Sequence, residues 1–135
     1  MILQLTNLLL IPKVKALAKY VPNTNENVLE KMLLNGIDQK DSIIYINKRD
    51  EEVNGFIFAT KETWEGEPVC FIQFCVIKPS TEEKYIGFEF LNKIRLWAKD
   101  KGLPKIITVI RRNPEGFKRK YKFMTDGILL KRSVL

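Results

Sequence analysis

The side chains best suited to bind a charged ligand lie together near the end of the sequence. Lys118, Arg119, Lys120 and Lys122 surround Tyr121, and the whole chain carries a formal net charge of +7. Such an excess of positive charge favours a polyanionic partner, such as a nucleic acid, a phosphorylated cofactor or a membrane surface. The alternative is a solvated helix face, which is the common role of a short run of lysines.

The residue types that are missing narrow the chemistry further. Histidine is absent, which excludes Ser-His-Asp and Cys-His catalysis and any histidine-ligated metal site. The two cysteines, Cys70 and Cys75, are five positions apart, so on a regular strand they would face opposite sides and could not form a disulfide. We therefore expect two buried, reduced thiols and no metal.

Changes in periodicity mark the strands that must position these residues. The pattern predicts strands over residues 1–6, 42–48, 54–60, 69–77, 105–110 and 127–134. The run over 69–77 is almost entirely apolar, as in a strand that is buried on both faces. Asn54-Gly55 is interpreted as the start of its strand, and residues 64–68 as a turn.

Helical spacing predicts helices over residues 8–21, from about 25 to 34, from Gly87 to Gly102, and over 114–121. Asn35-Gly36 is interpreted as the stop of the second helix. The order β-α-α-β-β-β-α-β-α-β predicts the α/β (α+β) class, with a mixed central sheet flanked by helices. We expect residues 1–135 to form a single domain.

No apolar run approaches the length of about 20 residues that a membrane-spanning helix needs. The N-terminus lacks the basic residues and the small-residue cleavage site of a signal peptide. We therefore expect a cytoplasmic protein that does not contact a membrane.

Three stretches resemble one known family. Residues 74–79 resemble a strand and its exit, and Gly87 with Phe90-Leu91 resembles the end of a cofactor motif and the helix after it. Residues 116–123 resemble a late aromatic motif. Together with the element order, these motifs identify the chain from about Ile43 onward as similar to the GCN5-related N-acetyltransferases.

This resemblance implies that acetyl-CoA lies between the parallel strands at 69–77 and 105–111. The pantetheine arm would pair with backbone groups of the first strand, and the pyrophosphate would rest on amides at the start of the next helix. The expected cofactor-binding residues are Cys75, Val76, Ile77, Lys84, Tyr85, Ile86 and Gly87. A backbone N–H near Val76 or Ile77 would hold the carbonyl oxygen during the reaction.

The sequence departs from the family pattern in the loop before Gly87. Glu82 stands where the family has Gln or Arg, and Tyr85 stands where it has the first glycine. A carboxylate about 4 Å from a phosphate repels it by roughly 1–4 kcal/mol at a surface site. In the alternative interpretation Ser80 and Glu83 form a capping box, so that the helix satisfies its own N-terminus and acetyl-CoA binding has been lost.

The resemblance assigns the proton donor for the departing thiolate to a tyrosine in the late motif. That position holds Lys118, and Tyr121 lies three residues further on, so both are candidate catalytic residues. The position of a glutamate base in some relatives holds Phe71, and deprotonation of the acceptor through water remains open.

Three functions follow from these observations. The first is an N-acyltransferase that moves acetyl from acetyl-CoA to an amine, on a small molecule or a protein, by direct attack. The second is a non-catalytic module of the same fold, for example in a phage assembly. The third is a nucleic-acid binder built on the basic segment.

Overall fold

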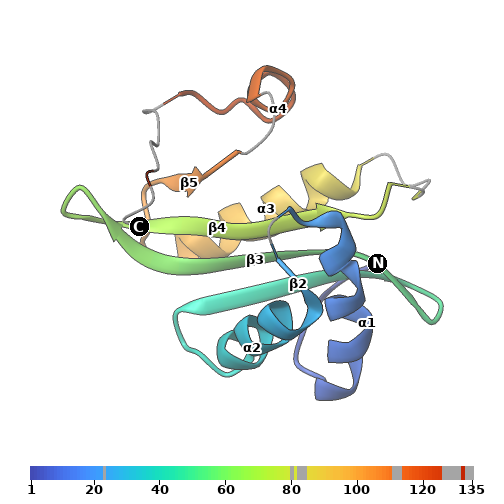
Figure 1. Ribbon diagram of the computed structural model, residues 1–135. Helices are drawn as coiled ribbons and strands as arrows, with labels where there is room; N and C mark the ends of the chain where they lie inside the picture. The colour runs from blue at the N-terminus through green and yellow to red at the C-terminus, as the bar shows by residue number, and fades with distance from the viewer. Residues whose placement is uncertain (23, 80, 82–84, 111–113, 126–131, 133–135) are drawn as a thin grey trace.

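The computed structural model describes residues 1–22, 24–79, 81, 85–110, 114–125 and 132. In these residues a five-stranded sheet has the strand order β1-β2-β3-β4-β5. The strands are β1 (Ile2–Gln4), β2 (Ser42–Arg49), β3 (Glu52–Trp64), β4 (Glu67–Ile77) and β5 (Ile106–Thr108) (Figure 1). The first four strands pair antiparallel and β5 pairs parallel to β4, which confirms the predicted mixed sheet.

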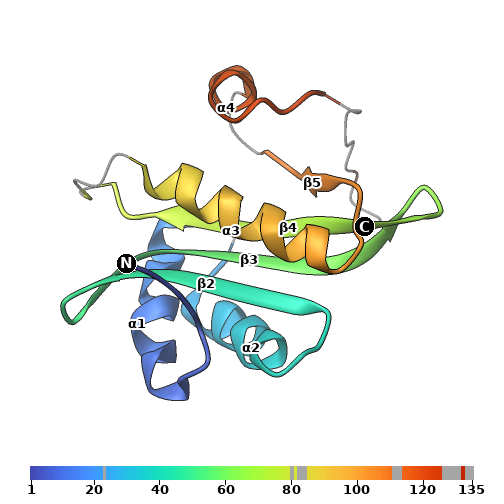
Figure 2. The same ribbon diagram turned by 180° about the vertical axis from the view of Figure 1, so that it is seen from behind.

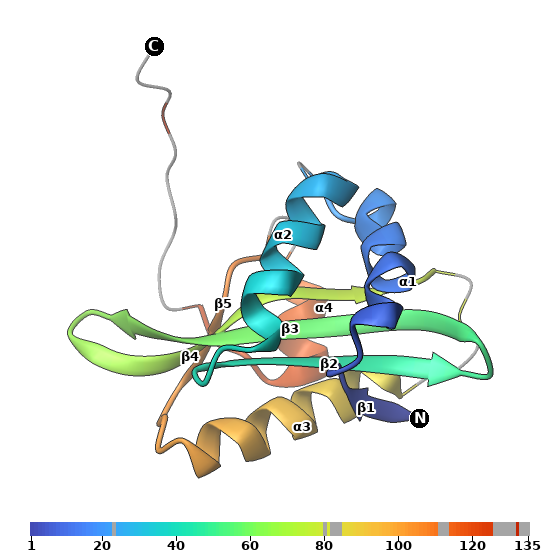
Figure 3. The same ribbon diagram turned by 90° about the horizontal axis from the view of Figure 1, so that it is seen from below.

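Helices cover both faces of the sheet. The N-terminal helices η1 (Leu8–Leu10), α1 (Ile11–Lys15), η2 (Ala16–Tyr20) and α2 (Glu26–Ile37) lie on one face, and α3 (Ile86–Asp100) lies on the other (Figure 3). Seen from behind, α3 crosses in front of the strands (Figure 2). The remaining helix is α4 (Pro114–Tyr121). In the described part of the chain, no helix combines the length and apolar character needed to cross a membrane.

Side-chain alternation along the strands divides the core into two clusters. Phe56 and Phe58 of β3 pack with the N-terminal helices, whereas Ile57 and Ala59 pack with α3. Phe90, fully buried, is a central residue of the α3 side. Each strand residue therefore belongs to one of two faces, and this assignment decides which side chains can meet at a site.

Two glycines that were predicted to mark element ends, Gly55 at a strand start and Gly36 at a helix stop, instead lie inside elements at close contacts. The β2–β3 turn lies at Asp50, whose φ is 55°, and not at Asn54-Gly55. Gly55 lies inside β3, where a Cβ would come within 2.7 Å of the carbonyl oxygen of Val76. Gly36 does not end α2, which runs on to Ile37, and a Cβ there would collide with the ring of Phe58. Both glycines permit the close approach of neighbouring elements.

The predicted helix over residues 8–21 is wrong as one continuous helix, because the segment divides into η1, α1 and η2. Pro12 occupies the first turn of α1, where its missing N–H costs no hydrogen bond, and a 3-10 turn capped by Asn7 precedes it. The predicted helix at 114–121 is confirmed. The predicted strand at 127–134 falls outside the described residues, apart from position 132.

Gln73 forms a bulge in β4, and this bulge changes the placement of the cysteines. Phe74 pairs with Phe58 whereas Ile72 pairs with Ala59, so Gln73 is the extra residue. The alternation resets at this point, and Cys70 and Cys75 therefore share the α3 face, contrary to the prediction. Both thiols are free, but only Cys70 is buried, and Cys75 is exposed.

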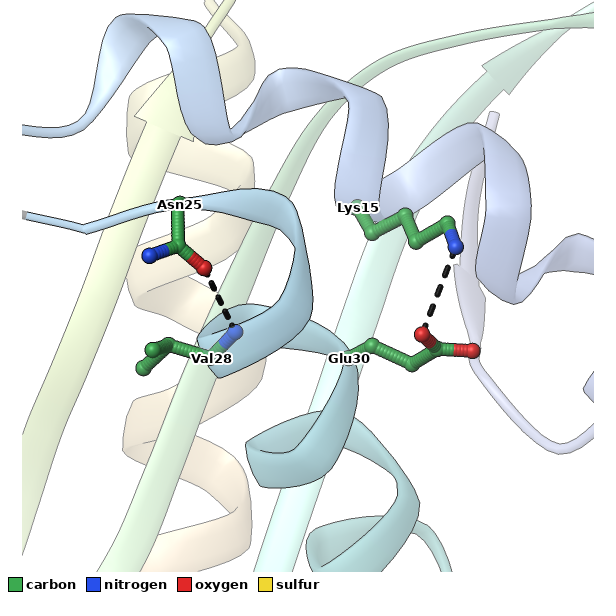
Figure 4. Close-up of polar contacts among 4 residues, drawn as sticks. All are labelled: Lys15, Asn25, Val28 and Glu30. Atoms are coloured by element: carbon green, nitrogen blue, oxygen red, sulfur yellow. Dashed lines mark hydrogen bonds and ion pairs between the residues drawn. The ribbon is translucent and has the colours of Figure 1, made fainter.

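Figure 4 shows two polar contacts of the N-terminal helices, one at the start of α2 and one between α1 and α2. The Oδ1 of Asn25 accepts a hydrogen bond of 2.9 Å from the N–H of Val28 and so caps α2. Lys15 of α1 reaches Glu30 of α2, with 3.3 Å between Nζ and Oε2. Since both side chains are partly exposed, this ion pair contributes at most about 1 kcal/mol.

We predict that Asn25→Ala lowers the free energy of unfolding by about 1 kcal/mol, because the first turn of α2 loses its side-chain acceptor. Urea denaturation measures the change. Asn27→Ala, an exposed position in the same turn, is the matched control and should change the free energy by less than about 0.5 kcal/mol. Equal losses in the two variants would contradict the role of Asn25 as the cap.

The thiol of Cys70 should be unreactive in the folded protein. Burial raises the pKa of Cys70 to about 11, so the reactive thiolate is scarce at pH 8. We predict alkylation by iodoacetamide at least about a hundredfold slower than in urea-unfolded protein, with a rate that rises as the pH approaches 11. Mass spectrometry of the Cys70 peptide measures the rate, and labelling as fast as in the unfolded chain would contradict the prediction.

Candidate functional site

The parallel strands β4 and β5 separate part of the way along β4. They pair only at Cys70–Ile106, Phe71–Ile107 and Ile72–Thr108. The Oγ1 of Thr108 donates a hydrogen bond to the carbonyl oxygen of Ile72, at 3.4 Å, in the last of these pairs. Val109 and Ile110 have left the strand, and the chain leads away toward α4 (Figure 1). Among the described residues, β4 beyond Gln73 therefore has a strand on its β3 side only.

Hydrogen bonds at the two ends of β4 show which backbone groups face this gap. The N–H of Cys70 donates to Lys105 beside β5, at 2.9 Å, whereas the N–H of Lys78 donates to Asn54 of the β3 chain, at 2.7 Å. Backbone groups alternate between the two edges of a strand. Counting back from Lys78, the backbone groups of Cys75 and Ile77 face the gap, and those of Val76 face β3. Val76 is therefore not a backbone ligand at this edge, contrary to the prediction.

The N-terminus of α3 lies beyond the end of β4, and no side chain in the described part of the chain caps it. The helix begins at Ile86 with Tyr85 as its N-cap residue, and the Tyr85 side chain makes no capping hydrogen bond. The predicted capping box of Ser80 and Glu83 falls outside the described residues. Tyr85 is exposed, and Ile86 and Gly87 are buried. The N–H groups of a first helical turn point outward and favour an anion. Glu82, Glu83 and Lys84 lie outside the described residues.

The end of α4 packs against this helix start. The ring centroids of Tyr121 and Phe88 are 5.0 Å apart, and a Cβ on Gly87 would collide with the Tyr121 hydroxyl. The Lys120 ammonium lies 5.6 Å from the Phe88 ring centroid and 5.3 Å from that of Tyr121, within the range of a cation–π contact. The structure thus brings the predicted site residues Gly87 and Tyr121 together.

Lys118, the other expected catalytic residue, contacts its own helix. Its Nζ lies 3.4 Å from Oε1 of Glu115, one turn earlier. An open hollow of about 530 Å³ is lined by Glu115, Lys118 and Arg119. The Lys118 ammonium is therefore paired within its own helix.

A polar chain that the sequence analysis did not identify crosses from β4 to β3. The Nε2 of Gln73 donates to Oγ1 of Thr60 at 3.0 Å, and Thr60 donates in turn to Oε1 of Glu62 at 2.9 Å. The period-two spacing of Thr60 and Glu62 was visible in the sequence. The bulge that brings Gln73 opposite them was not, because no residue type specifies a bulge at this position. Across the described residues, no three side chains of the metal-binding types group together.

Gly87 provides a test of the packing between α3 and α4. Gly87→Ala is predicted to lower the free energy of unfolding by about 1–3 kcal/mol, because the new methyl group overpacks against the Tyr121 hydroxyl. Tyr121→Phe removes that hydroxyl and should recover part of the loss. The next nearest atom to the Gly87 Cβ position is Cζ of the Tyr121 ring, at 3.0 Å, and this atom remains in Tyr121→Phe. Urea denaturation of the four proteins in this double-mutant cycle gives the coupling, and strictly additive losses would contradict the contact.

Three solved structures have a fold similar to that of this chain. The aminoglycoside N-acetyltransferase AAC(6')-Iy, solved with CoA, is 14% identical, has a TM-score of 0.83, and aligns over 100% of this chain and 95% of its own. A glucosamine-6-phosphate N-acetyltransferase from Arabidopsis thaliana is 13% identical, with a TM-score of 0.81 and coverage of 99% and 97%.

A predicted acetyltransferase from Clostridium acetobutylicum, solved with acetyl-CoA, is 14% identical, has a TM-score of 0.79, and covers 99% of this chain and 97% of its own. No protein-family model and no curated protein sequence matches the chain. The likeness therefore concerns the fold, and it extends over nearly the full length of this chain and of each of the three structures. The chain has the fold of the GCN5-related N-acetyltransferases, as its strand and helix motifs predicted.

Proposed function

We propose that the chain is an N-acetyltransferase that moves an acetyl group from acetyl-CoA to an amine on a small molecule. The observation that carries the proposal is the open edge of β4, at Cys75 and Ile77, beside a helix N-terminus that no side chain of the described residues caps. Solved structures of the same fold support it, because two of them hold CoA or acetyl-CoA.

The residues present fit an acyl-CoA. The amides of a pantetheine arm can pair with an open strand edge as another strand would, through the backbone groups of Cys75 and Ile77. The N–H groups of Ile86, Gly87 and Phe88 and the positive end of α3 suit a pyrophosphate. The lack of a side chain on Gly87 admits the Tyr121 hydroxyl, which thereby lies beside these N–H groups.

In the proposed reaction the nitrogen of a neutral amine attacks the thioester carbonyl carbon. A C–N bond forms, the C–S bond breaks, the amine loses a proton, and the CoA thiolate takes one up. A backbone N–H of Cys75 or Ile77 would stabilise the carbonyl oxygen as it gains negative charge. Tyr121 is a better candidate than Lys118 for protonating the thiolate, because its hydroxyl lies against Gly87 whereas the Lys118 ammonium is paired with Glu115.

The neighbours of the same fold support a small-molecule acceptor. AAC(6')-Iy is solved with an analogue that joins CoA to an acetylated neamine, and the Arabidopsis neighbour is named for glucosamine 6-phosphate. These two acceptors are both amino sugars but differ in charge. The acceptor of this chain is therefore proposed to be a small amine, with its charge still to be determined.

Acetyl-CoA should raise the melting temperature of the protein. A ligand that binds the folded state alone stabilises it by about 2.7 kcal/mol at one hundred times its dissociation constant. Free CoA should give a similar shift, and ADP, which lacks the pantetheine arm, a smaller one. Differential scanning fluorimetry measures all three. The absence of any shift at millimolar acetyl-CoA would overturn the proposal and favour a non-catalytic module of the same fold.

Variants of Tyr85 test the proposed phosphate site at the start of α3 separately from the open edge of β4. Tyr85→Asp offers the missing cap to α3 and adds a negative charge, whereas Tyr85→Asn offers a similar cap without the charge. Both variants should be as stable as the parent or up to about 1 kcal/mol more stable. The acetyl-CoA shift should decrease in both and should be smallest with Asp. An undiminished shift in Tyr85→Asp would show that the phosphates do not bind at this helix start.

A further inference from the structure

The face of the sheet on the side of the N-terminal helices changes from covered to open along β3. Phe56 and Phe58, which lie on this face, are 0% and 5% exposed. The next residues on the same face of β3 are Thr60, which is half-buried, Glu62, which is exposed, and Trp64, which is 37% exposed. The N-terminal helices therefore cover the face as far as Phe58, and an aromatic ring and a carboxylate emerge beyond it on the same side of the strand.

The Glu62 carboxylate is tied to the point where β4 and β5 separate. Two successive hydrogen bonds, of 3.0 and 2.9 Å, lead from Gln73 through Thr60 to Glu62. Gln73 is the bulged residue and directly follows Ile72, which belongs to the last pair between β4 and β5. Because each bond restrains the next side chain, the Glu62 carboxylate is linked through Thr60 to the residue at which the opening of the proposed acetyl-CoA site begins.

Charge at this place opposes the charge of the whole protein. The segment 61–67 holds Glu62, Glu65 and Glu67 against Lys61 alone, in a chain of net charge +7. Alternation sends the Lys61 side chain to the opposite face. Glu67 pairs with Lys105 at 3.0 Å, but Glu62 has no ion pair with any described cation. In the described part of the chain its carboxylate accepts a hydrogen bond from the Thr60 hydroxyl at Oε1, which leaves Oε2 able to accept a charged donor.

We propose that Glu62, together with the Trp64 ring, binds a positively charged group of the acceptor, so that the acceptor is an amine with a second cationic group. This inference rests on the proposed acetyltransferase function. A carboxylate beside an exposed indole attracts an ammonium through both charge and the face of the ring. The same carboxylate repels a phosphate or carboxylate on the acceptor, and it thereby selects against anionic amines.

A series of three amines of equal chain length tests the charge preference. 1,4-Diaminobutane, butylamine and 4-aminobutanoate share a primary amine and differ in the far end, which is positive, neutral or negative. With acetyl-CoA, release of the free thiol of CoA measures kcat/KM. We expect 1,4-diaminobutane to exceed butylamine by about threefold to tenfold, and 4-aminobutanoate to be the poorest. Equal values for the three amines would overturn the proposal.

Matched variants assign the preference to a residue. Glu62→Gln should abolish the advantage of 1,4-diaminobutane over butylamine, mainly through KM. Glu65→Gln removes the same charge from the adjacent turn and should keep the advantage. Thr60→Val, which removes the bridging hydroxyl, should give an intermediate loss. If Glu62→Gln and Glu65→Gln lost this advantage equally, the preference would come from the overall charge of the hairpin and not from Glu62. That result would overturn the proposal.

A binding measurement separates this inference from the proposed function. The indole N–H resonance of Trp64 can be assigned with Trp64→Phe, since the chain has only one other tryptophan, Trp97. Titration with 1,4-diaminobutane should shift this resonance in the parent but not in Glu62→Gln, and butylamine should shift it less. An unmoved resonance overturns the inference even where acetyl-CoA binds. Failure of acetyl-CoA to bind overturns the enzyme function, while the titration still decides the cationic site.

Discussion

The separation of β4 from β5 is the constraint on which the rest of this structure depends. The two strands share three residue pairs, after which the extra residue Gln73 shifts the register of β4 against β3. This one insertion turns the backbone groups of Cys75 and Ile77, and not those of Val76, toward the open edge, and it brings both cysteines to the α3 face. It also turns the Gln73 side chain toward Thr60. A regular β4 would keep none of these three features, because each follows from the change in alternation.

Close approach between elements is the second theme of the fold. Gly36 admits the ring of Phe58, Gly55 admits the carbonyl group of Val76, and Gly87 admits the hydroxyl of Tyr121. In each case the space a side chain would need is filled by a different element. The third of these contacts joins α4 to the start of α3, and so connects the basic segment to the helix end proposed for the phosphates.

Charge is distributed in a way that fits two different ligands. The uncapped start of α3, with Lys120 beside it, suits a polyanion such as the phosphates of acetyl-CoA. The hairpin that carries Glu62 and Glu65 suits a cation, and it lies at the other end of β4 from the start of α3 (Figure 1). A protein that joins an anionic cofactor to a cationic acceptor benefits from such a separation, because each ligand is attracted to its own end of the site.

The sequence by itself determined the mixed sheet, most of its strands and the helices α3 and α4, because hydrophobic period and apolar runs are local signals. It also gave Cys75, Ile77 and Gly87 as candidate site residues by resemblance. Only the tertiary structure decided that Val76 faces β3, that α3 begins at Ile86 with Tyr85 as its N-cap residue, and that Gly36 and Gly55 are close contacts. The link from Gln73 to Glu62 likewise depends on a bulge. These features depend on which element lies opposite a residue, and neighbours distant in sequence cannot be deduced from one chain's local pattern.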